Sequence, residues 1–145
     1  MQLRELLKAR SGEVRQVTTD VTIHTAIRIM SKHRIGSLMV VSPDGEIHGI
    51  VTERDCLHAV ADDQINLKTE HILSIASTDL AVAELDDDLR YVLNVMREKN
   101  CRHVPVIEDG KLYGMISIRD VALGRLDEAR TELKFLRNYI NGPGA

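Results

Sequence analysis

Two short motifs in this chain place a carboxylate three residues after a side-chain hydroxyl. The motifs are Thr52-Glu53-Arg54-Asp55 and Ser117-Ile118-Arg119-Asp120. Both fit the capping-box pattern of a helix start, where unpaired backbone N–H groups also favour a bound phosphate. A carboxylate near such a start can accept hydrogen bonds from the hydroxyls of a ribose. Each motif therefore predicts either a plain helix cap or a site for a phosphorylated nucleoside.

Glycines and arginines beside the two motifs would suit a ligand. Gly49 and Gly114 would let the backbone approach a ligand without an intervening side chain. Arg54 and Arg119 stand directly before the aspartates and could offer positive charge to a phosphate. Solvated charges on a helix face are an equally good interpretation of both arginines.

The motifs recur because the whole chain is duplicated. Before the turn at 42–45, matching residues lie 66 positions apart, as Asp20 and Asp86 do, and after it the offset is 65. The difference of one residue falls in this turn, which is matched by the shorter turn at 108–110. Turns of a folded unit tolerate such length changes best. An internal duplication therefore decides the fold.

Each repeat is predicted to fold as strand, helix, hairpin and helix. The predicted first helix of each repeat carries an i, i+3, i+4, i+7 apolar stripe. Apolar, β-branched runs joined by Pro-Asp-Gly or Glu-Asp-Gly are typical of hairpins. The predicted elements are a strand at 15–18, a helix after 20–25, hairpin strands at 37–41 and 47–51, a helix from about 53, a second stripe at 89–96, hairpin strands at 103–107 and 111–117, and a helix from about 118.

Each end of the chain adds a helix. Leu3, Leu6 and Leu7 give an N-terminal helix with one apolar face, and polar residues 62–69 form the predicted link between repeats. Near the C-terminus, a heptad pattern predicts a helix that Gly142-Pro143-Gly144 ends. Two heptads are too few for a free coiled coil, so this helix is expected to pack on its own core, the favoured interpretation, or on a partner subunit. Its apolar residues are Leu126, Ala129, Leu133, Leu136 and Ile140.

Composition limits the class of protein. The 145 residues are 43% apolar and 28% charged, as in ordinary globular chains. Halves of about 60 residues are close to the lower limit of stability, so they are expected to pack on each other. A net charge of −3 without a basic run gives no support for nucleic acid as a partner. The apolar stretches are too short to span a membrane, and the N-terminus has no apolar signal region, so no membrane partner is predicted. The two cysteines, Cys56 and Cys101, do not occupy matching positions in the repeats, and so few cysteines without a secretion signal predict a cytoplasmic protein.

Neither a catalytic nor a metal site is predicted. The six histidines lack metal-ligand spacing, and no nucleophile elbow or P-loop occurs. The duplication leaves no room for a catalytic domain, so the chain is not expected to be an enzyme. His103 lies on the predicted central strand of its repeat. A position facing the ligand and an ordinary surface or cap position are equally good interpretations of it.

The chain resembles a tandem pair of CBS (cystathionine β-synthase) domains, also called a Bateman module. The resemblance covers about Leu6 to Leu126 and rests on the repeated Gly-hydrophobic-x-Thr/Ser-x-x-Asp motif, on Arg102-His103-x-Pro105-Val106 and on Gly36-Ser37. It implies an α+β fold of two β-α-β-β-α units, packed sheet to sheet as a pseudo-twofold pair with extra N- and C-terminal helices. The expected domains are CBS domain 1 at 5–62, CBS domain 2 at 71–126, and a C-terminal helix and tail at 127–145.

The resemblance also implies clefts between the units that bind adenosine-containing ligands. AMP is favoured as a regulatory ligand, followed by ATP, ADP, NAD and S-adenosylmethionine, and no cofactor is required. By the family pattern, the two aspartates of the motifs would hold ribose hydroxyls and the Thr and Ser would meet phosphates. The candidate nucleotide-binding residues are Gly36, Ser37, Gly49, Thr52, Arg54, Asp55, Arg102, His103, Pro105, Gly114, Ser117, Arg119 and Asp120.

The two sites are not expected to be equal. Arg102 and His103 of the second repeat stand where the first has Gly36 and Ser37, so cationic groups are unevenly distributed. The acidic run at 86–88 either repels a polyphosphate or, the favoured interpretation, only caps a helix. We expect one well-formed adenylate site and one weaker site.

Two functions from different classes follow. In the first, the chain is a stand-alone sensor whose nucleotide changes the placement of its halves or of a second subunit. In the second, it is a ligand-free interaction scaffold in which the motifs are only helix caps. The presence of both hydroxyls and both aspartates favours the sensor, because a cap need not match in two copies. A homodimer, with the terminal helices as candidate contacts, and an unknown effector protein are the expected partners.

Overall fold

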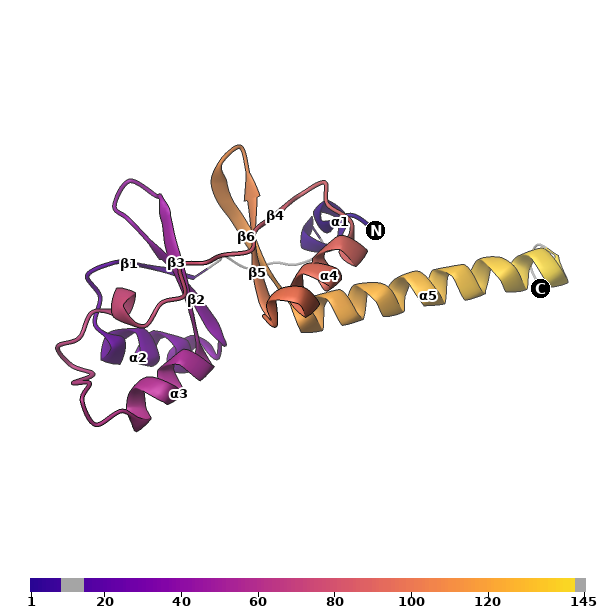
Figure 1. Cartoon of the computed structure of the whole chain (residues 1–145). Helices are drawn as coiled ribbons and strands as arrows, with labels where there is room; N and C mark the ends of the chain where they lie inside the picture. Colours follow the sequence, from indigo (N-terminus) through magenta and orange to yellow (C-terminus); the bar gives the residue numbers. More distant parts are fainter. Residues whose placement is uncertain (9–14, 143–145) are drawn as a thin grey trace. The chain divides into compact units, whose positions relative to one another are not determined.

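Two three-stranded sheets and their helices make up residues 1–8 and 15–142, the part of the chain that the computed structural model describes (Figure 1). The elements are α1 (Leu3–Lys8), β1 (Gln16–Thr18), α2 (Ile23–His33), β2 (Ser37–Val41), β3 (Ile47–Thr52), α3 (Glu53–Ala61), the 3₁₀ helix η1 (Ile72–Ser74), β4 (Ala83–Glu84), α4 (Leu89–Lys99), β5 (His103–Glu108), β6 (Lys111–Ser117) and α5 (Ile118–Asn141). The predicted α+β class, hairpins and helices are confirmed. The predicted tail after residue 142 lies outside the described residues.

The described chain divides into two compact units. The repeat-1 unit contains residues 15–80 and 109–113. The repeat-2 unit contains residues 1–8, 81–108 and 114–142. Residues 5–8, which fall at the beginning of the expected first domain, therefore lie in the unit built on the second repeat.

The repeat-1 unit holds the sheet β1-β2-β3 and the helices α2 and α3. Strand β1 runs parallel to β2, which pairs antiparallel with β3. Thr22 caps α2 by accepting a hydrogen bond from the Thr25 N–H at 3.2 Å. The predicted apolar stripe of α2 buries Ile23, Ala26 and Met30 in the core, so the 3.6-residue periodicity identified its inner face correctly.

The repeat-2 unit holds the sheet β4-β5-β6 and the helices α1, α4 and α5. The stripe of α4 buries Leu89, Val92 and Met96, as the duplication predicted. Leu3 of α1 is fully buried in the same core, and its N–H donates to the Asp87 carbonyl at 2.9 Å. The predicted N-terminal helix is therefore confirmed, and its apolar face is covered by residues from the far half of the chain.

The helix predicted from about residue 118 and the C-terminal heptad helix form one continuous helix, α5. Its first turns pack with α4 and bury Val121 and Gly124. Every residue at 129–141 is exposed, and this part of α5 extends past α4 (Figure 1). The favoured interpretation that the whole heptad stripe packs on its own core is therefore wrong. The physical reason is length, because the 24 residues of α5 run beside an α4 of only 11.

Gly49 and Gly114 occupy equivalent positions in β3 and β6 but have different neighbours. A Cβ atom at Gly49 would lie 2.8 Å from the backbone oxygen of Ser77. The approach is this close because Ile50 and Ser77 exchange two backbone hydrogen bonds, of 3.0 and 2.9 Å. At Gly114 the nearest atom would be Leu7 Cδ1 at 3.5 Å, an ordinary contact. Backbone packing therefore requires a glycine at position 49 only.

We expect Gly49→Ala to lower the free energy of unfolding by about 1–3 kcal/mol, the usual cost of an overpacked site. Gly114→Ala is the matched control and should cost markedly less, since its new methyl group has room. Urea unfolding followed by circular dichroism measures both changes. Equal losses in the two variants would contradict the assignment of Gly49 to backbone packing.

Candidate functional site

Thr52 and Asp55 form a complete capping box at the start of α3. The Asp55 N–H donates to Thr52 Oγ1 at 3.4 Å. In return, Asp55 Oδ2 accepts the Thr52 N–H at 2.9 Å and the Thr52 hydroxyl at 3.0 Å. These bonds are part-buried and use Oδ2 alone. The box therefore fixes the carboxylate while leaving Oδ1 outside the capping bonds.

Ser117 and Asp120 repeat this geometry at the start of α5. The Asp120 N–H donates to Ser117 Oγ at 3.2 Å. Asp120 Oδ2 accepts the Ser117 N–H at 2.7 Å and the Ser117 hydroxyl at 2.8 Å. The prediction that both motifs cap a helix is thus confirmed. A ligand role for the same groups stays a prediction.

Backbone hydrogen bonds hold the beginning of a strand beside each box. The Glu53 N–H donates to the Gly36 carbonyl at 3.0 Å, just before β2. The Ile118 N–H donates to the Arg102 carbonyl at 2.8 Å, just before β5. Within each unit, the structure therefore brings predicted residues together: Gly36, Ser37, Thr52 and Asp55 in the repeat-1 unit, and Arg102, His103, Ser117 and Asp120 in the repeat-2 unit.

The remaining predicted residues differ in exposure. Arg54, Arg102 and Arg119 are exposed, whereas Gly49, Pro105 and Gly114 are buried. The arginines lie at the boxes with side chains in solvent, where a phosphate could meet them. The three buried residues lie within β3, β5 and β6, and their role in binding a ligand stays a prediction.

Charge distinguishes the two boxes. The residue after the capping hydroxyl is Glu53 in the repeat-1 unit and the uncharged Ile118 in the repeat-2 unit. Arg102, beside the second box, replaces Gly36, beside the first. The second box therefore has an extra base and the first an extra acid. An anionic ligand group meets the more favourable field at the start of α5.

The three acidic residues before α4 have separate structural partners. Asp88 is the N-cap of α4 and accepts the Arg90 N–H at 2.8 Å, which lowers the pKa of its carboxyl. Asp87 accepts the Glu84 N–H at 2.8 Å. Asp86 pairs with the Arg4 guanidinium at 3.1 Å. These contacts favour the helix-capping interpretation of the acidic run over repulsion of a polyphosphate.

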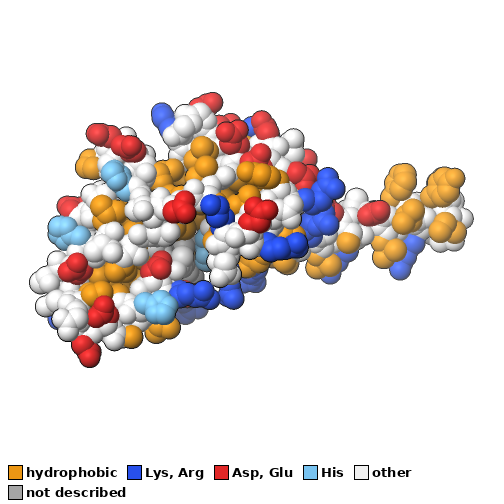
Figure 2. Space-filling view, viewed as in Figure 1, with side chains coloured by type: hydrophobic (Ala, Val, Ile, Leu, Met, Phe, Trp, Pro, Cys, Tyr) orange, Lys and Arg blue, Asp and Glu red, His pale blue; other side chains and the backbone are white. Residues whose placement is uncertain are grey.

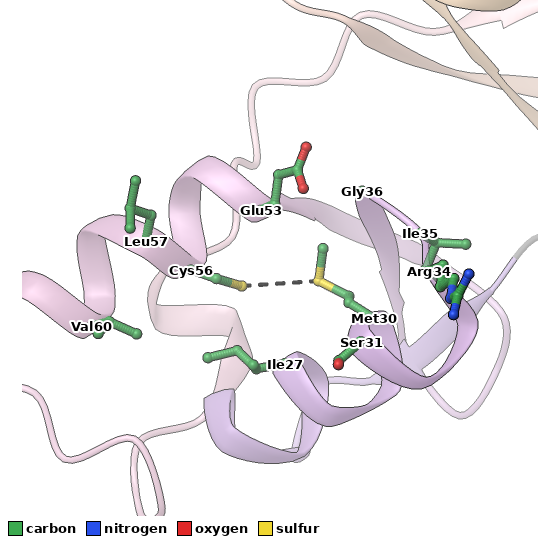
Figure 3. Close-up of a pocket in the computed structure, with 10 residues that line it drawn as sticks. All are labelled: Ile27, Met30, Ser31, Arg34, Ile35, Gly36, Glu53, Cys56, Leu57 and Val60. Carbon is green, nitrogen blue, oxygen red and sulfur yellow. Dashed lines mark hydrogen bonds between the residues drawn. The ribbon is translucent and has the colours of Figure 1, made fainter.

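An open, largely apolar hollow of about 640 Å³ lies between α2 and α3 in the repeat-1 unit (Figure 3). This hollow was not expected from the sequence. The available signal was the pair Leu57 and Val60, which share a face of α3 and are 67% and 58% exposed. The lining residues are Ile27, Met30, Ser31, Arg34, Ile35, Gly36, Glu53, Cys56, Leu57 and Val60.

Cys56 lies in this hollow with its Sγ 4.0 Å from Met30 Sδ (Figure 3). Burial raises the pKa of the Cys56 thiol, and the nearby carboxylates of Asp55 and Glu53 raise it further. The thiol is therefore neutral at physiological pH and a poor nucleophile. Within residues 1–8 and 15–142, no group of three or more His, Cys, Asp or Glu side chains could hold a metal ion.

The two repeats, each with a strand-helix-hairpin-helix order and a capping box after the hairpin, define a duplicated α+β module. The family model "CBS domain" matches residues 5–62 and 72–125. The chain therefore belongs to the CBS domain family, as the resemblance indicated. In the described part of the chain, none of the helices has the length and apolar character needed to cross a membrane.

Relatives and solved structures agree with this assignment. The chain is 32% identical over 139 residues to the Arabidopsis thaliana protein "CBS domain-containing protein CBSX3, mitochondrial", covering 93% of this chain and 68% of the relative. The crystal structure of the CBS-domain containing protein ATU1752 from Agrobacterium tumefaciens matches with a TM-score of 0.81 at 31% identity, over 86% of this chain and 99% of that one. The CBS domain protein PAE2072 from Pyrobaculum aerophilum, complexed with AMP, matches with a TM-score of 0.74 at 28% identity, over 83% and 89% of the two chains.

Proposed function

We propose that this protein is a regulatory module that binds an adenosine-containing nucleotide, AMP in preference to ATP, ADP, NAD or S-adenosylmethionine. The observation that carries the proposal is the same hydroxyl–carboxylate box, with an exposed arginine before the aspartate, at a helix start in both units. The AMP complex of the similar protein PAE2072 supports the choice of ligand class. The module acts through an effector protein rather than by catalysis.

In this proposal, the aspartates receive the ribose hydroxyls and the helix starts receive the phosphate. The capping box orients each carboxylate through Oδ2 before any ligand binds. A preoriented acceptor lowers the entropic cost of ordering the site. The nucleotide then shifts a conformational equilibrium by the difference between its affinities for the two states.

The two boxes are proposed to bind with unequal affinity. Each box has one equivalent arginine, Arg54 or Arg119, but Arg102 adds a positive charge at the box of the repeat-2 unit. At the other box, Glu53 adds a negative charge and lines the same hollow as Arg34. A phosphate is therefore favoured at Ser117 and Asp120. Isothermal titration with AMP should resolve one stronger and one weaker site, and two sites of equal affinity would contradict this assignment.

A ligand-free interaction scaffold is the second candidate function. The completeness of both capping boxes favours it, because each hydroxyl and carboxylate already has a partner within its own box. A homodimer is compatible with either function and is retained as a proposal.

A thermal-shift panel with AMP, ADP, ATP, NAD and S-adenosylmethionine separates the two functions. A ligand at about a hundred times its dissociation constant stabilises the folded state by roughly 2.7 kcal/mol, which raises the melting temperature by several degrees. We expect a selective rise with AMP. If none of these ligands raises the melting temperature at millimolar concentration, the scaffold is the better account.

A further inference from the structure

The distal segment of α5, residues 129–141, has an apolar surface that its own unit leaves in solvent. Leu133, Leu136 and Ile140 are 50%, 48% and 77% exposed. Figure 2 shows hydrophobic side chains gathered along this part of the helix. The helix is fixed upstream, where Glu128 binds the terminal amine of Met1 at 2.6 Å. The distal segment therefore presents an apolar stripe from a firmly held base.

The stripe has the spacing of a coiled-coil seam. Ala129, Leu133, Leu136 and Ile140 follow one another at intervals of four, three and four residues, so Leu133 and Ile140 take a positions and Ala129 and Leu136 take d positions. An a/d stripe is the pattern that a second helix covers, and the exposed Tyr139, at a g position, widens it on one side, while Phe135 lies off the seam at a c position. Two heptads are short for a free coiled coil, but anchoring on a folded unit keeps this segment helical before it pairs, which lowers the entropic cost of association.

The flanks of the stripe carry opposite charges in a specific register. Glu132 takes a g position and Arg137 takes the e position of the following heptad. In a parallel pair of helices, the g residue of one chain faces this e residue of the other. Two identical helices would thus form the Glu132–Arg137 pair twice within residues 129–141, although Arg130 would face Arg125 just upstream of this segment. An antiparallel pair brings e residues towards e, so that Arg130 of one chain would meet Arg137 of the other and Glu132 would have no basic partner at these positions.

We infer that the distal segment is a homodimerisation element in which α5 pairs in parallel with α5 of a second copy of this chain. The inference assigns a surface to the homodimer proposed above and does not depend on nucleotide binding. The position of Glu132 argues against a membrane surface as the occupant. The bases Arg130, Lys134 and Arg137 would favour an anionic bilayer, but a bilayer would leave Glu132 unpaired beside the apolar stripe, whereas a second copy offers it Arg137.

Disulfide trapping in the full chain tests the pairing. Equal d positions face each other in a parallel pair, so Leu136→Cys should form a disulfide between positions 136 of two chains under mild oxidation with oxidised glutathione. Thr131→Cys, at the exposed f position on the opposite face, is the matched control and should remain unlinked. Peptide mass spectrometry distinguishes the new bond from any that involves Cys56 or Cys101. Equal linkage of both variants, or a dimer without the 136–136 bond, would overturn the inference.

Charge reversal tests the parallel register without cysteines. Glu132→Arg and Arg137→Glu should each weaken dimerisation about tenfold in sedimentation experiments, and the double variant should recover it. Failure of the double variant to recover would overturn the parallel pairing. A monomer that binds vesicles of phosphatidylserine and phosphatidylcholine through α5 would replace it with a membrane role. A dimer that all three variants leave unchanged would place the homodimer on another surface.

Discussion

Replacing Asp55 or Asp120 with alanine is expected to abolish nucleotide binding at the corresponding box, with a loss of affinity of about a hundredfold or more. Each variant removes an acceptor of ribose hydroxyls together with the group that holds the capping hydroxyl in place. The loss with AMP should be larger for Asp120→Ala, because the proposed stronger site lies at the start of α5. Isothermal titration of both variants measures the effect site by site.

The stability of these variants must be followed alongside binding. Loss of one half of a capping box should lower the free energy of unfolding by about 1 kcal/mol, which leaves the protein folded. Asp88→Ala is the matched control, because Asp88 caps α4 but lies outside both boxes. It should lose part of a helix cap while retaining nucleotide affinity. Wild-type affinity in both Asp55→Ala and Asp120→Ala would reject the ribose assignment and leave the boxes as caps alone.

Leu3→Ala is expected to destabilise the repeat-2 unit by about 2–5 kcal/mol, the range for a buried leucine whose site collapses only in part. Leu3 is fully buried among Leu85, Leu89 and Val121, so its truncation leaves a cavity in the core of that unit. Urea unfolding of the full chain gives the change in free energy. Because the two units have separate cores, the repeat-1 unit should retain its own stability.

A leucine at the surface of the same unit provides the control. Leu123 is 50% exposed on α5, so Leu123→Ala removes less buried area and should cost under about 1 kcal/mol. If Leu3→Ala proved equally mild, α1 would be only a loosely attached segment.

The regular elements could be predicted because their signals are local. The stripe of α2 and the β-branched run at 37–41 specify a helix and a strand within a few residues, and both occur where expected. The capping boxes are equally local, and the structure forms both. Because the chain is duplicated, each pattern occurs in both repeats, and the agreement between the two copies established the order of the elements.

The features that escaped prediction depend on distant residues. The apolar face of α1 was predicted, but nothing near Leu3 in the sequence indicates that residues of the second repeat cover this face. The close approach of the Ser77 backbone to Gly49 could not be predicted either, because the two residues lie far apart in the sequence. The heptad stripe of α5 and the stripe of α4 were both visible, but the sequence did not show that only the first turns of α5 would pack with α4. Tertiary packing decides such cases over local propensity.

The position of α1 makes the first repeat an insertion within the second. The core of the repeat-1 unit is drawn from one continuous stretch, from Val17 to Ala76, whereas the core of the repeat-2 unit extends from α1 to Val121. During synthesis, the first repeat can fold as soon as its own residues have emerged, but Leu3 must wait for partners between Ala83 and Val121 that are made after the whole first repeat. Closing so long a loop adds little to the equilibrium cost and more to the folding time. The apolar face of α1 therefore stays uncovered until the residues from Ala83 to Val121 have been synthesised, and chaperones have access to it during that time.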